Sequence, residues 1–233
     1  MDTLYPPIID VIIPAFNEEN AVGNVVKDLP RSRVREVVVV DNNSRDDTRR
    51  AAEEAGATVL DEPRQGYGYA CLKGIEYLRN KPTPPDVVVF IDADYSDHPE
   101  ELPLLVDYLT TNNLDMVIGS RALGKREPGS MTPQQVFGNW LATTLISRLY
   151  GVHYTDLGPF RAVRYTGLLE MDMQDTTYGW TVEMQLKAAK MGFRTGEVPV
   201  TYRRRIGHSK ISGTVKGTLL AGYKILSWIF KYR

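Results

Sequence analysis

Five short runs of apolar, mostly β-branched residues most constrain what this chain can fold into. Two of them, VVVV at 37–40 and VVVFI at 87–91, are apolar at consecutive positions, so both faces of each strand must be buried. Segments with helical spacing of apolar residues separate the runs, as in a parallel sheet built from βαβ units. We therefore predict an α/β fold in which helices cover both faces of a mainly parallel sheet, with strands at 8–13, 35–41, 57–61, 86–92 and 114–119.

Residue types at the ends of the intervening segments predict where helices begin and end. Ser44 can cap a helix that ends at Gly56, and Asp97 with Glu100 three residues later resembles a capping box. Residues 120–133 are rich in Gly, Pro and charge, which predicts a mobile loop. Further helices are expected over 134–151 and 179–192, and a strand over 197–204.

Composition excludes several classes of protein. The 233 residues are 42% hydrophobic, which is enough for one substantial core with room for a small appended segment. A net charge of −1 gives no general attraction to nucleic acid, so we expect no nucleic-acid partner. Cys71 is the only cysteine, which excludes an intramolecular disulfide and favours the cytoplasm. The N-terminal segment lacks a basic leader, and no apolar run reaches the ~20 residues that cross a bilayer as a helix.

Polar side chains follow three of the predicted strands at the point where each strand ends. Ligands of open parallel sheets bind beyond these carboxyl ends, where loops lead into helices and present free backbone N–H groups. The chain therefore brings acidic and amide side chains from three strands to one edge of the sheet: Asn17 and Glu18, Asp41 and Asn43, and Asp92 and Asp94.

Asp92 and Asp94 form a D-A-D sequence at the end of the fourth strand. Gathering this much negative charge costs stability unless a cation compensates, and carboxylates suit a hard divalent ion such as Mg²⁺ or Mn²⁺. Strand alternation would put both carboxylates on one side, with Ala93 small enough to let a ligand approach. Acids at strand ends also cap helices, but together with Glu18 and Asp41 we favour a metal that neutralises a diphosphate leaving group.

Other chemistries lack their sequence patterns. The stretch RQGYGYACLKG at 64–74 does not make a full G-x-G-x-x-G and does not follow the first strand, so a dinucleotide-binding dehydrogenase is disfavoured. There is no G-x-x-x-x-G-K-[ST] phosphate loop and no nucleophile elbow. The three histidines are scattered singly, without zinc-ligand spacing.

Eight segments in order resemble inverting family 2 glycosyltransferases of the GT-A fold, and in particular the dolichyl-phosphate and polyprenyl-phosphate mannose or glucose synthases. The likeness covers nearly the whole chain. The segments are PAFNE at 14–18, DNNSRDDT at 41–48, GYGYACLKG at 66–74, DADYSDHPE at 92–100, GSR at 119–121, TDLGPFRAVR at 155–164, GWTVEMQLKAAKMGF at 179–193 and YRRRIGHSKISG at 202–213.

This resemblance implies a Rossmann-like three-layer sandwich and a role for each matching residue. Nucleotide-sugar binding falls to Pro14, Ala15, Glu18, Asp41, Asn43, Asp92, Ala93, Arg204 and Lys210. Asp94, with Asp92, would hold Mg²⁺ or Mn²⁺, and Arg121 would bind phosphate. Asp156 would lie near the acceptor, so the expected catalytic residues are Asp94, Arg121 and Asp156.

Three departures from the family pattern bear on the substrates. The frequent D-D-x-S is D-N-N-S here, so Asn42 removes one acid near the base. Ser96 stands where mannose synthases often carry Gln, which weakens an assignment to mannose. L-G-P-F at 157–160 replaces the more usual S-G-F before Arg161, which suggests a specialised acceptor side.

The resemblance predicts one GT-A domain over 1–212, and the spacing of apolar and basic residues predicts an amphipathic helix over 213–233. Apolar residues on one face of that helix and lysines on the other suit a membrane interface, with Trp228 and Tyr232 at headgroup level. Packing against the helix's own domain is the alternative. The basic face contains Lys216, Lys224, Ser227 and Lys231, and the apolar face contains Leu219, Ile225, Leu226, Ile229 and Phe230.

The predicted reaction moves a hexose from a UDP-glucose or GDP-mannose type donor to an acceptor, with inversion. A lipid phosphate acceptor, such as polyprenyl or dolichyl phosphate, is already anionic and requires no strong base. A soluble or protein hydroxyl acceptor is the alternative, and Asp156 is then the candidate base. A catalytically silent nucleotide-sugar-binding module is a further alternative. We expect a cytoplasmic protein with peripheral contact to the inner face of the membrane.

Overall fold

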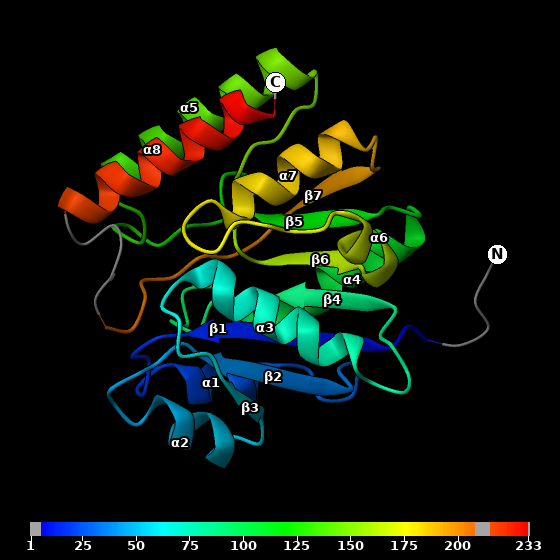
Figure 1. Ribbon diagram of the computed structural model, residues 1–233, viewed down its shortest axis with the longest axis vertical. Helices are drawn as coiled ribbons and strands as arrows, with labels where there is room; N and C mark the ends of the chain where they lie inside the picture. Colours follow the sequence, from blue (N-terminus) through cyan, green and yellow to red (C-terminus); the bar gives the residue numbers. More distant parts are fainter. Residues whose placement is uncertain (1–5, 208–214, 233) are drawn as a thin grey trace.

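A computed structural model describes residues 6–207 and 215–232. Its centre is a seven-stranded sheet in the order β3-β2-β1-β4-β6-β5-β7 (Figure 1). β6 runs antiparallel to both of its neighbours, and the other pairs are parallel. The mainly parallel mixed sheet is therefore confirmed, and its strands are β1 (Ile9–Ala15), β2 (Glu36–Asp41), β3 (Thr58–Asp61), β4 (Val87–Phe90), β5 (Met116–Ser120), β6 (Arg161–Arg164) and β7 (Thr195–Pro199).

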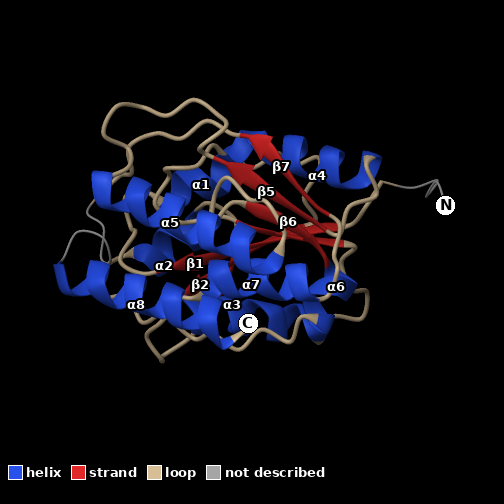
Figure 2. Ribbon diagram, turned by 90° about the horizontal axis from the view of Figure 1, so that it is seen from above, coloured by secondary structure: helices blue, strands red, loops and turns tan. Residues whose placement is uncertain are grey.

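Helices cover both faces of this sheet, which makes a three-layer sandwich (Figure 2). Successive residues of one strand enter different cores: Val38 and Val40 pack on one side, and Val37 and Val39 on the other. This is why the consecutive valines are all buried. The helices are α1 (Val22–Asp28), α2 (Thr48–Glu54), α3 (Tyr67–Arg79), the 3₁₀ helix η1 (Pro99–Glu101), α4 (Leu102–Thr111), α5 (Pro133–Tyr150), α6 (Tyr165–Glu170), α7 (Trp180–Lys190) and α8 (Val215–Lys231).

Two predicted helix caps are wrong. α2 begins at Thr48 rather than after Ser44, whose hydroxyl instead accepts a hydrogen bond from the Asn17 backbone N–H. η1 follows His98, and its start has no side-chain cap. Asp97 is buried, and its carboxylate oxygens have no hydrogen-bond partner among the described residues. Burial raises the pKa of Asp97 well above its ordinary value.

α5 forms where its sequence signals predict it. The hydroxyl of Thr132 accepts a hydrogen bond from the Gln135 N–H, and the Gln135 side chain accepts one from the Thr132 N–H, which completes a capping box. Gly151 ends the helix with a φ of 71°, a conformation that glycine adopts without steric cost. The loop before it, predicted over 120–133, leads from β5 into this helix.

The C-terminal helix α8 packs on α5 and α7 (Figure 1). Trp228 and Ile229 are buried there, and the Trp228 indole N–H donates to Asp175. The expectation that Trp228 sits at headgroup level is therefore wrong. The side chains of Lys216 and Leu219 lie outside the described residues. No helix within the described ranges has the length and apolar character that crossing a membrane requires.

Candidate active site

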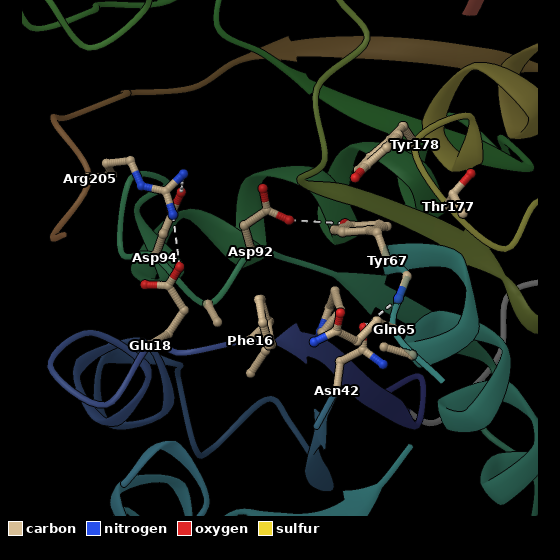
Figure 3. A pocket seen from close by; sticks show the side chains of 15 residues that line it. Phe16, Glu18, Asn42, Gln65, Tyr67, Asp92, Asp94, Thr177, Tyr178 and Arg205 are labelled. Carbon is tan, nitrogen blue, oxygen red and sulfur yellow. Dashed lines mark hydrogen bonds and ion pairs between the residues drawn. The ribbon is translucent and has the colours of Figure 1, made fainter. Parts of the chain in front are cut away.

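A cavity of about 490 Å³ opens beyond the carboxyl ends of β1, β2 and β4 (Figure 3). It lies at the sheet edge where the sequence predicts a ligand. Three of its walls come from the strand ends, the start of α3 and the loop before α7. It is lined by Pro14, Ala15, Phe16, Glu18, Asn42, Gln65, Gly66, Tyr67, Ala70, Asp92, Ala93, Asp94, Thr177, Tyr178 and Arg205.

The structure brings one group of the predicted donor-binding and metal-binding residues together around this cavity: Pro14, Ala15, Glu18, Asp92, Ala93 and Asp94. The backbone structure that brings Asp92 and Asp94 together differs from the prediction. β4 ends at Phe90, so residues 91–94 are irregular backbone and a turn rather than alternating strand. Neither aspartate caps a helix, since η1 follows His98.

Other predicted donor-binding residues lie elsewhere. Asp41 is buried, and its side chain accepts a hydrogen bond from the Ser44 N–H without lining the cavity. Asn43 is exposed, with a φ of 64° in the turn after β2. Arg204 is also exposed and donates to the Pro128 carbonyl. Lys210 lies outside the described residues.

Arg205 takes the place in the cavity that the sequence assigned to Arg204. Its guanidinium lies 2.7 Å from a Glu18 carboxylate oxygen and 3.2 Å from an Asp94 oxygen (Figure 3). The segment that carries it is fixed by backbone contacts, because the Ile206 N–H donates to the Asp94 carbonyl. A cation therefore already stands between two carboxylates, one that follows β1 and one that follows β4.

Asp92 is half-buried, whereas Asp94 is buried. Asp92 accepts a hydrogen bond of 2.9 Å from the Tyr67 hydroxyl, which comes from the first residue of α3 (Figure 3). Burial, together with the neighbouring Asp94 carboxylate, raises the pKa of Asp92 to about 7, against the opposite effect of the Tyr67 hydrogen bond. A bound cation would favour the ionised form of this carboxyl group.

The donor set at this edge fits a divalent ion that shares its coordination with a ligand. No cluster of three or more His, Cys, Asp or Glu side chains suited to a metal occurs in the described part of the chain. One or two carboxylates with substrate phosphate oxygens are the usual protein environment of Mg²⁺. Asp94 and Asp92 supply such a pair, and Arg205, which pairs with Asp94, would have to release that carboxylate oxygen to the ion.

Asn42 is a cavity residue whose role the sequence did not reveal. Its side-chain N–H₂ donates to the carbonyls of Glu62 and Arg64, and its side-chain oxygen accepts from the Gly66 N–H. These three bonds fix the segment that leads into α3. A carboxylate at this position could not make the first two, so the amide matches the loop that it holds.

Arg121 and Asp156, two of the expected catalytic residues, form a close pair that does not line the donor cavity. The guanidinium of Arg121 contacts both carboxylate oxygens of Asp156 at 2.7 and 2.8 Å, and its backbone N–H donates to the same carboxylate. Asp156 is fully buried. Both carboxylate oxygens of Asp156 therefore contact Arg121, and Asp156 would have to leave Arg121 before it could act as a base.

A second cavity, of about 460 Å³, has Asp156 in its wall and extends along α5. Its lining mixes cationic and apolar side chains. The lining includes the guanidinium groups of Arg126 and Arg148, the imidazole of His153 and the apolar side chains of Met131, Val136 and Trp140. Sequence patterns gave no signal for this cavity, because its residues come from a loop, a helix and the segment before β6.

Comparisons with known proteins agree with this architecture. A crystal structure of glucosyl-3-phosphoglycerate synthase from Mycobacterium tuberculosis with Mn²⁺, uridine diphosphate and glucosyl-3-phosphoglycerate superposes with a TM-score of 0.76 at 22% identity, covering 97% of this chain and 80% of that one. This likeness is one of fold, and the expected GT-A fold is confirmed.

Sequence relatives are closer. An undecaprenyl-phosphate mannosyltransferase of Micrococcus luteus is 32% identical over 221 residues, covering 88% of each chain. A dolichyl-phosphate hexose transferase of Haloferax volcanii is 34% identical over 214 residues, covering 90% of this chain and 89% of that one. The family description "Glycosyl transferase family 2" matches residues 10–170. The chain therefore belongs to glycosyl transferase family 2.

Proposed function

We propose that this protein transfers a hexose from a nucleoside diphosphate sugar to a polyprenyl phosphate, with inversion at the sugar. The observation that carries the proposal is the meeting of Asp92, Asp94 and Arg205 in a cavity beyond the strand ends. Carboxylates and a guanidinium at one point suit a metal-bound diphosphate. The names of two relatives, a mannosyltransferase and a hexose transferase acting on polyprenyl-type phosphates, support the acceptor class.

The donor cavity has the composition that a nucleoside and a sugar require. Phe16, Tyr67 and Tyr178 provide flat apolar surface, while Asn42 and Gln65 provide amide groups. Small residues beside the strand ends leave space for a ligand. This arrangement supports nucleoside binding between β1 and the start of α3, with the diphosphate toward the metal-binding carboxylates.

Mg²⁺ or Mn²⁺ is the cofactor that this donor set favours. Asp94 and Asp92 would hold it together with diphosphate oxygens, and the solved glucosyl-3-phosphoglycerate synthase was crystallised with Mn²⁺ and uridine diphosphate. When bound, the ion neutralises charge on the diphosphate leaving group. Two residues of this chain complete the donor site: Arg205 would contact phosphate oxygens, and Tyr67 orients Asp92.

The second cavity supports an acceptor that has an anionic head and an apolar body. Arg126, Arg148 and His153 suit a phosphate, and the apolar side chains along α5 suit hydrocarbon. Asp156 lies in the wall of this cavity and holds Arg121 by a two-point contact. We assign to Asp156 the role of orienting Arg121 toward phosphate, because both of its oxygens are engaged.

A hydroxyl acceptor, soluble or on a protein, is the second candidate. It is favoured by the uncharged polar residues of the second cavity, which include Asn139, Thr143 and Ser147. This reaction requires a base, and Asp156 would then have to leave Arg121. A silent nucleotide-sugar-binding module would use the donor cavity alone. A cytoplasmic enzyme with peripheral membrane contact fits the lipid acceptor.

A thermal-shift panel of nucleotide sugars tests the donor. We expect a single nucleotide class to raise the melting temperature in the presence of Mn²⁺, because a ligand that binds only the folded state stabilises it by mass action. Asp94→Asn should lose the part of the shift that depends on Mn²⁺. Glu54→Gln, an exposed acid on α2, is the matched control and should behave as wild type. Absence of any shift with every nucleotide sugar would sink the donor assignment.

Turnover assays discriminate the acceptors. Wild-type protein with the matching donor and Mn²⁺ should glycosylate a polyprenyl phosphate and leave soluble hydroxyl acceptors unchanged. Faster transfer to a hydroxyl acceptor would favour the second candidate. Donor binding without transfer or hydrolysis would favour the silent module.

A further inference from the structure

The loop between α6 and α7 contains a buried acid that lies outside the donor cavity. Asp175 is 1% exposed. One of its carboxylate oxygens accepts hydrogen bonds from the backbone N–H groups of Thr177, at 2.7 Å, and Gly179, at 3.0 Å. Its own N–H donates to Glu183, a fully buried acid on α7 that Lys187 neutralises at 2.9 Å. Asp175 therefore sets the backbone course of residues 175–179.

The other carboxylate oxygen of Asp175 faces α8. It accepts from the indole N–H of Trp228 and lies 3.2 Å from the ammonium group of Lys224. Trp228 packs so closely that a Cβ on Gly179 would lie 2.4 Å from its ring. A residue 53 positions away in sequence thus completes the hydrogen bonding of the loop.

The same loop forms part of the donor cavity on its inner side. Thr177 and Tyr178 line the cavity, and the carbonyl of Thr176 accepts from the Tyr69 N–H at 3.1 Å. The loop backbone presses on the start of α3, since a Cβ on Gly68 would lie 1.9 Å from the Asp175 carbonyl. Tyr67, which holds Asp92, is the neighbouring residue of α3.

We propose that Asp175 is a positioning residue that couples the seating of α8 to the donor cavity. Its two oxygens make different contacts, since one holds the loop that bears Thr177 and Tyr178, and the other is fixed by Trp228 and Lys224 of α8. The C-terminal helix is thus part of the scaffold of the donor site. The identity of the ligand as a nucleotide sugar rests on the proposed function, whereas the coupling itself does not.

Two conservative variants separate this coupling from a general loss of packing. Trp228→Phe removes the indole N–H and keeps an aromatic ring. Asp175→Asn can keep an oxygen toward the two loop N–H groups while presenting an amide N–H₂ to Trp228 and Lys224. Tyr150→Phe is the matched control: it removes a different hydrogen bond to α8, from the Tyr150 hydroxyl to the Ile229 carbonyl, on the side of α5.

Hydrogen exchange by mass spectrometry of ligand-free protein is the first readout. Peptides covering 172–179 and 66–70 should exchange faster in Trp228→Phe and Asp175→Asn than in Tyr150→Phe. Each variant is measured the same number of degrees below its own melting temperature. The second readout is the Kd of the matching nucleotide sugar by calorimetry. It should rise about fivefold or more in the two variants, with little additional effect in the double variant.

The proposal would be overturned if the hydrogen-exchange rates of peptides 172–179 and 66–70 were the same in Trp228→Phe and Tyr150→Phe. An unchanged donor Kd in both variants would overturn it as well. If wild-type protein binds no nucleotide sugar, the proposed function fails, and the exchange measurement alone decides the coupling.

Discussion

At the scale of single residues, hydrogen-bonding capacity decides what the site tolerates. An acid at position 42 would resemble the family pattern more closely, but the structure gives Asn42 two carbonyl oxygens to donate to. The side chain is only 6% exposed, so water cannot replace these bonds cheaply. The amide is therefore matched to the segment 62–66, and this segment leads into the wall of the donor cavity.

Asn42→Asp should destabilise the protein and weaken donor binding. A carboxylate there faces the Glu62 and Arg64 carbonyls without a proton to share, and a buried acceptor left unsatisfied costs about 1–3 kcal/mol. The midpoint of urea unfolding measures the loss. Asn43→Asp is the control, because Asn43 is exposed and Asp also tolerates its left-handed backbone. Equal midpoints for the two variants would contradict the argument.

Cavity residues that follow β1 and β4 were predictable, whereas the prediction failed for Asp41 and Asn43 at the end of β2 and missed residues from distant loops. Glu18, Asp92 and Asp94 follow β1 and β4, so the strand pattern alone put them at one edge. Arg205 and Tyr178 enter from segments whose course depends on tertiary contacts. Arg204, the predicted residue, and Arg205, the residue in the cavity, are adjacent in an extended segment, where successive side chains alternate in direction. No pattern in three successive arginines reveals which one turns inward.

At the scale of elements, the buried strands were predictable and β6 was not. The valine runs are apolar on both faces, which only a sheet covered on both sides can bury. β6 begins with Arg161, a charged residue that is fully buried and donates to the carbonyls of Gly158 and Thr181. Burial lowers the pKa of Arg161 to about 10. A short run that starts with arginine carries no strand signal.

The contact between α3 and the loop before α7 gives a prediction for this element. Gly68→Ala should destabilise the protein by about 1–3 kcal/mol, because the added Cβ would lie 1.9 Å from the Asp175 carbonyl and must displace backbone. Donor affinity should fall as well, since Tyr67 and Tyr178 both lie next to this contact.

Gly138→Ala is the control for that substitution. Gly138 lies within α5, and a Cβ there meets nothing within 4 Å, so alanine should stabilise the helix by about 0.5–1 kcal/mol. Chemical unfolding of both variants measures the difference. If both substitutions proved equally harmless, α3 and the loop would have to be freer to move apart than their contacts imply.

At the scale of the whole molecule, α5 and α8 lie side by side (Figure 1). Both helices expose large apolar side chains. Phe137 and Trp140 of α5 are 59% and 57% exposed, and their rings pack together at 5.7 Å. Tyr223 and Phe230 of α8 are 73% and 56% exposed. The inward face of α8 is committed to Trp228 and its buried neighbour, so these exposed residues are the ones among the described side chains that a membrane contact would use.

Replacement of Tyr223 and Phe230 by serine should weaken binding to vesicles that contain anionic lipid. The two residues are seven positions apart, hence on one face of α8, and lost burial of even part of each ring reduces partitioning by about tenfold. Sedimentation with vesicles measures the bound fraction. The double replacement of Leu104 and Tyr108 by serine is matched to it, because both are exposed apolar residues on α4. α4 packs in the core on the opposite face of the sheet, so this control should sediment as wild type. Sedimentation of wild-type protein that neither double replacement reduces would place the membrane contact elsewhere. Absence of sedimentation for the wild-type protein would rule out the contact.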